Sequence, residues 1–166
     1  MSMYEDFIDV SNFDRIFNQI LTVKKGKNVV HSRLNFEDLA FSDRAHFLVD
    51  FIKSFEGITG VTYKILFWDD EFTILNAFNK YNIQTKEVRV NRSYLNTDIP
   101  GEVVSAEMLS VNEKLSYGLI DMHFNFEQAI EPSFNGRLQI CLNRENCNIL
   151  FDIYDDRGCD VFFLWK

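Results

Sequence analysis

The sequence predicts a single α+β domain over residues 1–166, with two or three helices on a mixed, largely antiparallel sheet that ends in a C-terminal β-hairpin. Three observations lead to this prediction. The length of 166 residues fits one hydrophobic core. Hydrophobic residues make up 46% of the chain, which is enough apolar surface for a folded domain. Segments with helical apolar spacing alternate with segments rich in β-branched and aromatic residues.

The N-terminal third predicts a helix, a strand and a second helix. Apolar residues at helical spacing predict the first helix over Asn12–Val23, closed by Gly26. The run Val29–Phe36 predicts a short strand. We expect Ser42 to cap the second helix and Gly57 to end it. The buried stripe of this helix is predicted to consist of Phe47, Leu48, Phe51, Ile52 and Phe55.

The middle third predicts three strands and one helix. Val61–Trp68 is rich in β-branched and aromatic residues, which indicates a core strand. The segment Phe72–Tyr81 returns to helical spacing. Two further strands are predicted over Thr85–Asn91 and Glu102–Leu109, with the segment Ser93–Gly101 as the loop between them.

The C-terminal third is predicted to be mostly strand. The loose alternation of Leu115–Phe126 predicts a strand, and Asn125–Ile130 is expected to form a short helical turn that Pro132 stops. Apolar runs separated by polar turns then indicate hairpin strands. These final strands are predicted over Arg137–Leu142, Ile149–Tyr154 and Val161–Trp165.

Charge and composition exclude several classes of protein. The chain has 17 Lys and Arg against 25 Asp and Glu, a net charge of −8. This charge disfavours nucleic-acid binding, since phosphates are repelled, and it favours a basic protein partner. No apolar run approaches the about 20 residues of a membrane span. The acidic segment Met1–Val10 does not resemble a signal peptide, so we expect a cytoplasmic protein.

The cysteines and the missing motifs argue against a metal centre and against catalysis. Cys141, Cys147 and Cys159 are odd in number and lack the spacing of zinc ligands, which predicts buried free thiols. The three histidines fall in no recognised catalytic pattern, and the chain has no P-loop and no HExxH motif. We therefore expect a protein that is not an enzyme and that uses no cofactor.

A first acidic cluster consists of Asp69, Asp70 and Glu71. It directly follows a predicted core strand, a place where α/β folds often bind ligands. The alternative is that these residues form the acidic first turn of the next helix, which the helix dipole favours. Both interpretations leave the three carboxylates as candidates for contact with a basic partner.

A second acidic cluster contains Asp152, Asp155, Asp156 and Asp160. Four carboxylates within nine residues could hold a hard divalent cation. The favoured alternative is a tight turn, in which Arg157 pairs with a carboxylate and Gly158 adopts positive φ. We take Asp155, Asp156 and Asp160 of this turn, with the first cluster, as the acidic surface that binds a partner.

The last aromatic residues offer a second kind of contact. The run Phe162 to Trp165 gives apolar side chains to both faces of a strand, so at least one of them could be exposed. An exposed aromatic ring beside acidic groups is typical of an interface hot spot. The alternative is that the ring lies buried under a helix.

The C-terminal segment carries a resemblance to a known family. Cys147–Val161 resembles an uncharacterised family of small bacterial proteins that end in a strand, a Tyr-Asp-Asp-Arg-Gly-x-Asp-Val turn and a final strand. The segment from Arg44-Ala45 through the strand Val61–Trp68 is also similar. This resemblance implies no activity. In size, charge and class the chain also resembles immunity proteins of bacterial toxin systems, including contact-dependent growth inhibition, which bind and block a basic toxin.

These observations together predict a non-catalytic acidic binding protein. The expected function is that of an immunity protein that binds and neutralises a cognate toxin domain, with a basic nuclease as the expected toxin. The alternative is a small metal-assisted hydrolase that uses Asp152, Asp155, Asp156 and Asp160.

Overall fold

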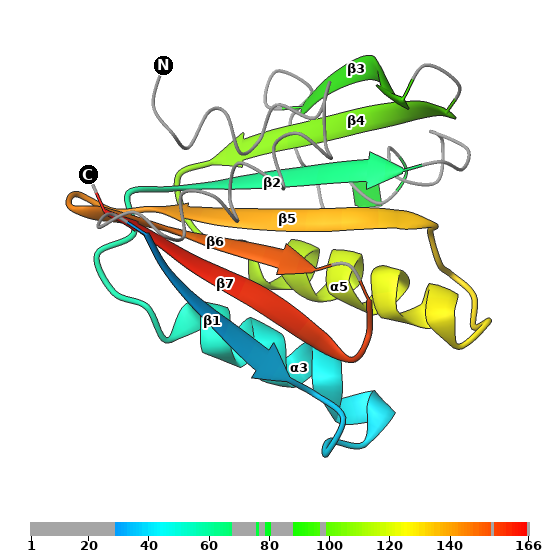
Figure 1. Cartoon of the computed structure of the whole chain (residues 1–166), viewed down its shortest axis with the longest axis horizontal. Helices are drawn as coiled ribbons and strands as arrows, with labels where there is room; N and C mark the ends of the chain where they lie inside the picture. Colours follow the sequence, from blue (N-terminus) through cyan, green and yellow to red (C-terminus); the bar gives the residue numbers. More distant parts are fainter. Residues whose placement is uncertain are drawn as a thin grey trace.

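A computed structural model describes residues 29–67, 76, 79–80, 88–96, 99–153 and 155–165. These residues form one open, antiparallel sheet with two helices on the same face (Figure 1), which confirms the predicted α+β class. The sheet has seven strands: β1 (Val29–Asn35), β2 (Gly60–Phe67), β3 (Val88–Asn96), β4 (Ile99–Met108), β5 (Gly136–Asn143), β6 (Cys147–Ile153) and β7 (Gly158–Trp165). The helices are α3 (Phe41–Lys53) and α5 (Glu113–Glu127).

The strand order is β1-β7-β6-β5-β2-β4-β3, so β1 and β3 lie at the two edges of the sheet. Each strand pairs antiparallel with its neighbours. The strands predicted near residues 29, 61, 137, 149 and 161 are confirmed. The predicted helix over Asn12–Val23 lies outside the described residues, and so does most of Phe72–Tyr81. The helix count of the whole chain therefore stays a prediction.

The middle loop is shorter than predicted. The segment Ser93–Gly101 was expected to be a loop, but β3 continues to Asn96 and β4 begins at Ile99. The two strands pair across this point, with Ser93 opposite Gly101 and Tyr94 opposite Pro100. β4 accommodates Pro100 because this residue stands near the start of the strand and pairs with the edge strand β3.

The boundaries of α3 differ from the prediction at both ends. Ala40, not Ser42, occupies the N-cap position, and no side chain caps the helix there. The helix ends at Lys53 with Ser54 as the C-cap, three residues before Gly57. Gly57 instead adopts a φ of +73° in the connection to β2, a backbone conformation that favours glycine. The buried face of α3 comprises Ala45, Leu48, Val49 and Ile52.

The segment Leu115–Phe126 was predicted to be a strand, and that prediction is wrong. It lies within α5, and Asn125–Ile130 is not a separate helical turn because α5 continues to Glu127. The Asn112 side chain caps the helix by accepting a hydrogen bond from the Leu115 N–H at 2.9 Å. Helical spacing was present in the sequence, but most sides of α5 are buried, so the apolar residues also resemble an alternating strand.

The main core lies between the sheet and the two helices. Aromatic rings pack across this core. Phe51 of α3 contacts Phe151 of β6 edge to face, with ring centroids 6.1 Å apart. The Tyr63 hydroxyl of β2 lies 2.7 Å from Ser116 Oγ of α5, which ties the helix to the sheet. Every residue of β6 is buried, on both faces of the sheet. The core thus fixes β6 and β7, the two strands on either side of the acidic C-terminal turn.

Candidate functional site

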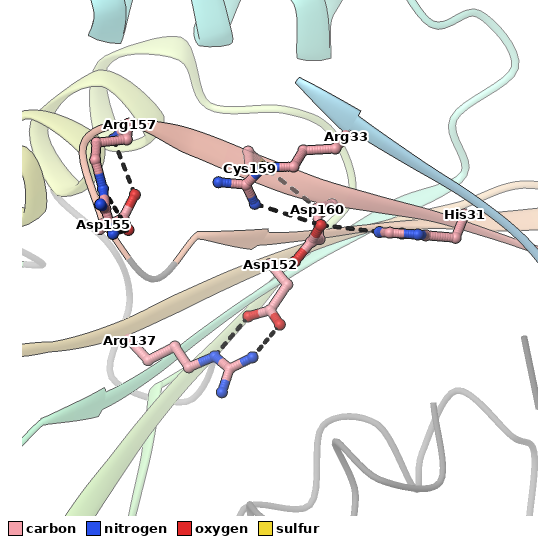
Figure 2. A network of polar contacts seen from close by, with 8 residues as sticks. All are labelled: His31, Arg33, Arg137, Asp152, Asp155, Arg157, Cys159 and Asp160. Carbon is pink, nitrogen blue, oxygen red and sulfur yellow. Dashed lines mark hydrogen bonds and ion pairs between the residues drawn. The ribbon is translucent and has the colours of Figure 1, made fainter. Parts of the chain in front are cut away.

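Residues 155–157 connect β6 to β7 and form a turn that is held by its own side chains (Figure 2). The Arg157 N–H donates to Asp155 Oδ1 at 2.9 Å, and Arg157 Nη2 donates to Asp155 Oδ2 at 2.8 Å. Burial raises the pKa of Asp155, but the hydrogen bonds and charge of Arg157 outweigh it and hold the pKa below its ordinary value. The expected pairing of Arg157 with a nearby carboxylate is confirmed.

Asp156 links this turn to both helices. Arg44 Nη1 of α3 donates to the Asp156 carbonyl oxygen at 3.0 Å and lies 3.3 Å from its Oδ2. Gln128, the C-cap residue of α5, donates from Nε2 to the same Oδ2 at 2.8 Å. The Phe36 N–H donates to the Arg157 carbonyl oxygen at 2.8 Å. The turn therefore fastens three separate segments of the chain to one another.

Gly158 has a different role from the one predicted. Its φ is not positive, since Gly57 is the one glycine with positive φ among the described residues. A Cβ on Gly158 would instead lie 2.6 Å from the Leu34 carbonyl oxygen and 2.8 Å from Arg33 Nη2. Glycine is required here because β1 approaches the start of β7 more closely than a side chain allows.

Asp160 fixes the edge strand β1. His31 Nε2 lies 2.8 Å from Asp160 Oδ1, and Arg33 Nη1 lies 3.5 Å from the same atom. The His31 ring also stacks on Phe162, with ring centroids 4.8 Å apart. Figure 2 shows both β1 side chains pointing toward Asp160.

Asp152 is fully buried one strand further into the sheet and forms a two-pronged ion pair with Arg137 of β5. Arg137 Nε donates to Asp152 Oδ1 at 2.8 Å, and Nη2 donates to Oδ2. The sheet register places Arg33, Asp160, Asp152, Gln139 and Lys64 opposite one another on five neighbouring strands. A polar row thus crosses the sheet face opposite the helices.

The second acidic cluster is therefore not an exposed surface. Asp155, Asp156 and Asp160 are 7%, 5% and 8% exposed, and each is engaged by a different set of donors. In the described part of the chain, no three His, Cys, Asp or Glu side chains gather as a possible metal site. The first cluster, Asp69, Asp70 and Glu71, lies outside the described residues. That either cluster binds a partner stays a prediction.

The three cysteines are free and buried, as predicted. Cys159 Sγ lies 3.4 Å from the Asp160 carbonyl oxygen. Burial raises the pKa of the Cys159 thiol well above its ordinary value, and the charges of Asp152 and Asp160 add to this effect. This thiol is therefore poorly suited to nucleophilic chemistry at neutral pH.

His123 of α5 is a buried polar residue that belongs to no motif in the sequence. It is 3% exposed, its ring stacks on Phe134 at 5.4 Å, and neither ring nitrogen has a hydrogen-bond partner of good geometry among the described residues. Burial lowers its pKa to about 4, against a partial offset from the Ile153 backbone and Asp155. Its wrong assignment to a strand concealed which face of the element it occupies.

Exposed carboxylates gather on the helices and their flanking segments, residues 36–58 and 109–133, which we call the helix layer. This layer has nine acidic and three basic residues. One acidic residue, Glu113, pairs with Lys53 at 2.8 Å. All nine are exposed apart from the half-buried Asp121: Glu37, Asp38, Asp43, Asp50, Glu56, Glu113, Asp121, Glu127 and Glu131.

Four large apolar side chains are exposed on the same helix layer, and one of them is Leu109, which follows β4 and is 87% exposed. Phe126 and Ile130 lie at the end of α5 and just after it, and Phe47 lies in α3. Phe47 was predicted to be part of the buried stripe, but it is 40% exposed because α3 turns Leu48 and Val49 to the core instead. An acidic surface that contains apolar side chains has the composition of a binding surface for a basic protein.

Trp165 lies at the opposite end of β7 from the turn and is 49% exposed. Phe162, three residues earlier in the strand, is 1% exposed, so the terminal aromatic run divides between the surface and the interior. A cavity of about 270 Å³ opens beside Trp165, and its other lining residues are Gly57, Arg144, Glu145, Asn146 and Cys147.

Comparison of the chain with protein-family models, curated proteins and solved structures finds no significant match. Neither helix of the described residues combines the length and the apolar character needed to cross a membrane.

Proposed function

We propose that the chain is a non-catalytic binding protein, an immunity protein that binds and neutralises a basic toxin domain, such as a nuclease, in the cytoplasm. The observation that carries this proposal is the helix layer, which combines nine acidic residues with the exposed Phe47, Leu109, Phe126 and Ile130. This layer contributes most of the net charge of −8.

Recognition of a basic partner by the helix layer has two parts. The negative carboxylates attract a basic partner over a Debye length of about 8–10 Å. This attraction raises the association rate. Apolar side chains that are already exposed can then be buried in the interface and slow dissociation. Neither part requires a reaction, so the helix layer is suited to recognition.

The acidic turn supports the same proposal. A catalytic or metal-binding carboxylate needs access to its substrate or ion, whereas Asp152, Asp155, Asp156 and Asp160 are buried and engaged within the chain. Their contacts join β1, α3 and α5 to the C-terminal strands. These carboxylates are thus better suited to stabilising the fold than to a hydrolytic reaction.

The first experiment is affinity capture of the tagged chain from its source organism, with intact mass spectrometry of the bound fraction. We expect one stoichiometric basic protein whose toxic or nuclease activity the purified chain suppresses. A chain that captures no basic partner, or a partner whose activity is unchanged on binding, would contradict the proposal.

The second experiment locates the surface by charge reversal. Glu127→Lys on the helix layer should slow association with the captured partner at least about threefold at low salt, since steering depends on local charge. Glu107→Lys is the matched control, because Glu107 is also exposed but lies in β4, outside the helix layer. Equal effects of the two substitutions would exclude the helix layer as the binding surface.

A further inference from the structure

We propose that the cavity beside Trp165 receives one Lys or Arg side chain of a protein partner, held between the indole face and the Glu145 carboxylate. This inference rests on the proposed function, because it names a contact point for the basic partner. It adds a second region to the interface, which adjoins the helix layer at Gly57.

The cavity is built from three separate segments. Gly57 comes from the connection between α3 and β2, Arg144 to Asn146 from the turn between β5 and β6, and Trp165 from the end of β7. Its volume of about 270 Å³ lies just below the about 300–1,000 Å³ of small-molecule sites. A single side chain therefore fits it better than a cofactor does.

The indole ring supplies the first half of the recognition. Trp165 pairs with Cys147 in the register of β6 and β7, so its position is fixed by the sheet. Trp165 is nevertheless 49% exposed, and it is one of the residues that line the cavity. A tryptophan face is the most favourable aromatic surface for a cation, and tryptophan is enriched among the residues that dominate interfaces.

The charges around the cavity supply the second half. Glu145 is exposed and borders the cavity, and Glu56, also exposed, precedes Gly57 in the chain. Arg144 borders the cavity as well, but it already takes part in another interaction within the chain, and its backbone N–H lies 3.4 Å from Asn148 Oδ1. Because the Glu145 and Glu56 carboxylates are exposed at this place and the chain as a whole carries a net charge of −8, the cavity favours a cation over an anion.

The test titrates N-acetyl-arginine amide into the ¹⁵N-labelled chain and follows the indole N–H signal of Trp165 by NMR. Trp165→Leu assigns the signal. We expect a saturable shift at millimolar concentrations, and we expect Glu145→Gln to weaken the binding at least threefold. The matched control Glu107→Gln should leave it unchanged, and the neutral isostere N-acetyl-citrulline amide should cause no saturable shift.

An absent shift, or equal shifts with arginine and citrulline amides, would overturn the proposal. The captured partner gives a separate test, in which Trp165→Leu should weaken binding at least tenfold while the variant keeps its melting temperature within a few degrees. Unchanged affinity would overturn the role of the cavity and leave the proposed function in place. Failure to capture a basic partner would instead contradict the proposed function, whatever the amide titration shows.

Discussion

The two ends of the β6–β7 pair differ in how they use their polar groups. At the turn end, residues 155–157, the carboxylates of Asp155 and Asp156 are buried and engaged by Arg157, by Arg44 of α3 and by Gln128, the C-cap residue of α5. At the Trp165 end, an aromatic ring and the Glu145 carboxylate remain accessible beside a cavity. The turn end has more charged residues in the sequence. The side chains that a partner can reach, however, lie at the Trp165 end.

Acidic residues in a sequence therefore do not by themselves identify a partner-binding surface. A carboxylate contributes to recognition when no group of its own chain satisfies it, and it contributes to stability when buried donors surround it. The contrast makes a direct prediction: substitutions at the turn end should change stability, and substitutions at the Trp165 end should change binding.

The largest expected effect is that of Asp152→Ala. The substitution leaves Arg137 in the sheet without its buried carboxylate, which should lower the free energy of unfolding by about 3–5 kcal/mol. Urea-induced unfolding measures the change. Glu145→Ala, at the other end, is the control and should cost less than about 0.5 kcal/mol. Similar costs for both substitutions would remove the proposed contrast.

The second prediction concerns acid stability. The pKa of His123 is about 4 in the folded chain and about 6.5 when unfolded, so the unfolded chain binds more protons between these values. Stability should fall by up to about 3 kcal/mol as the pH drops from about 6.5 to about 4. His123→Phe should flatten this part of the curve, measured by unfolding at several pH values. Asp155, whose pKa is lowered, should lose its stabilising contribution only at more acidic pH.

If the stability of His123→Phe depends on pH as that of the unsubstituted chain does, the buried His123 does not cause the loss of stability in acid.

The smallest predicted effects are those of alanine substitutions at two glycines, Gly158 at the turn end and Gly57 at the Trp165 end. Gly158→Ala places a Cβ against the Leu34 carbonyl oxygen, which should cost about 1–3 kcal/mol and loosen the pairing of β1 with β7. Gly57→Ala meets no atom within 4 Å and should cost about 1 kcal/mol, through its positive φ alone. Amide hydrogen exchange in β1 separates them: exchange should accelerate in Gly158→Ala only.

Much of the fold could be predicted from the sequence because local patterns determined it. The strands near residues 61, 137, 149 and 161 are apolar runs bounded by polar turns, and these two signals were sufficient to predict them. Helix α5 was mistaken for a strand because burial on most of its sides removed the amphipathic signal that separates the two. The cap signal at Asn112 was present and would have corrected the assignment.

The candidate site was harder to predict because its contacts are not local. Asp160 meets His31 across 129 positions of sequence, and Asp156 meets Arg44 across 112. No spacing rule connects such residues, so the sequence alone makes these carboxylates look available to a partner. The exposure of Trp165 could be anticipated only as one of two alternatives, since a terminal strand gives side chains to both faces.

The pairing of β1 with β7 also bears on how the chain is synthesised. Asn35, at the end of β1, lies opposite Gly158, and a ribosome adds the intervening residues at about 5–20 per second. The edge strand therefore exists for about 6–25 s before its only neighbour in the described sheet is made. During that time its backbone amide and carbonyl groups are open to other nascent chains, so slower translation should make molecular chaperones more important for this protein.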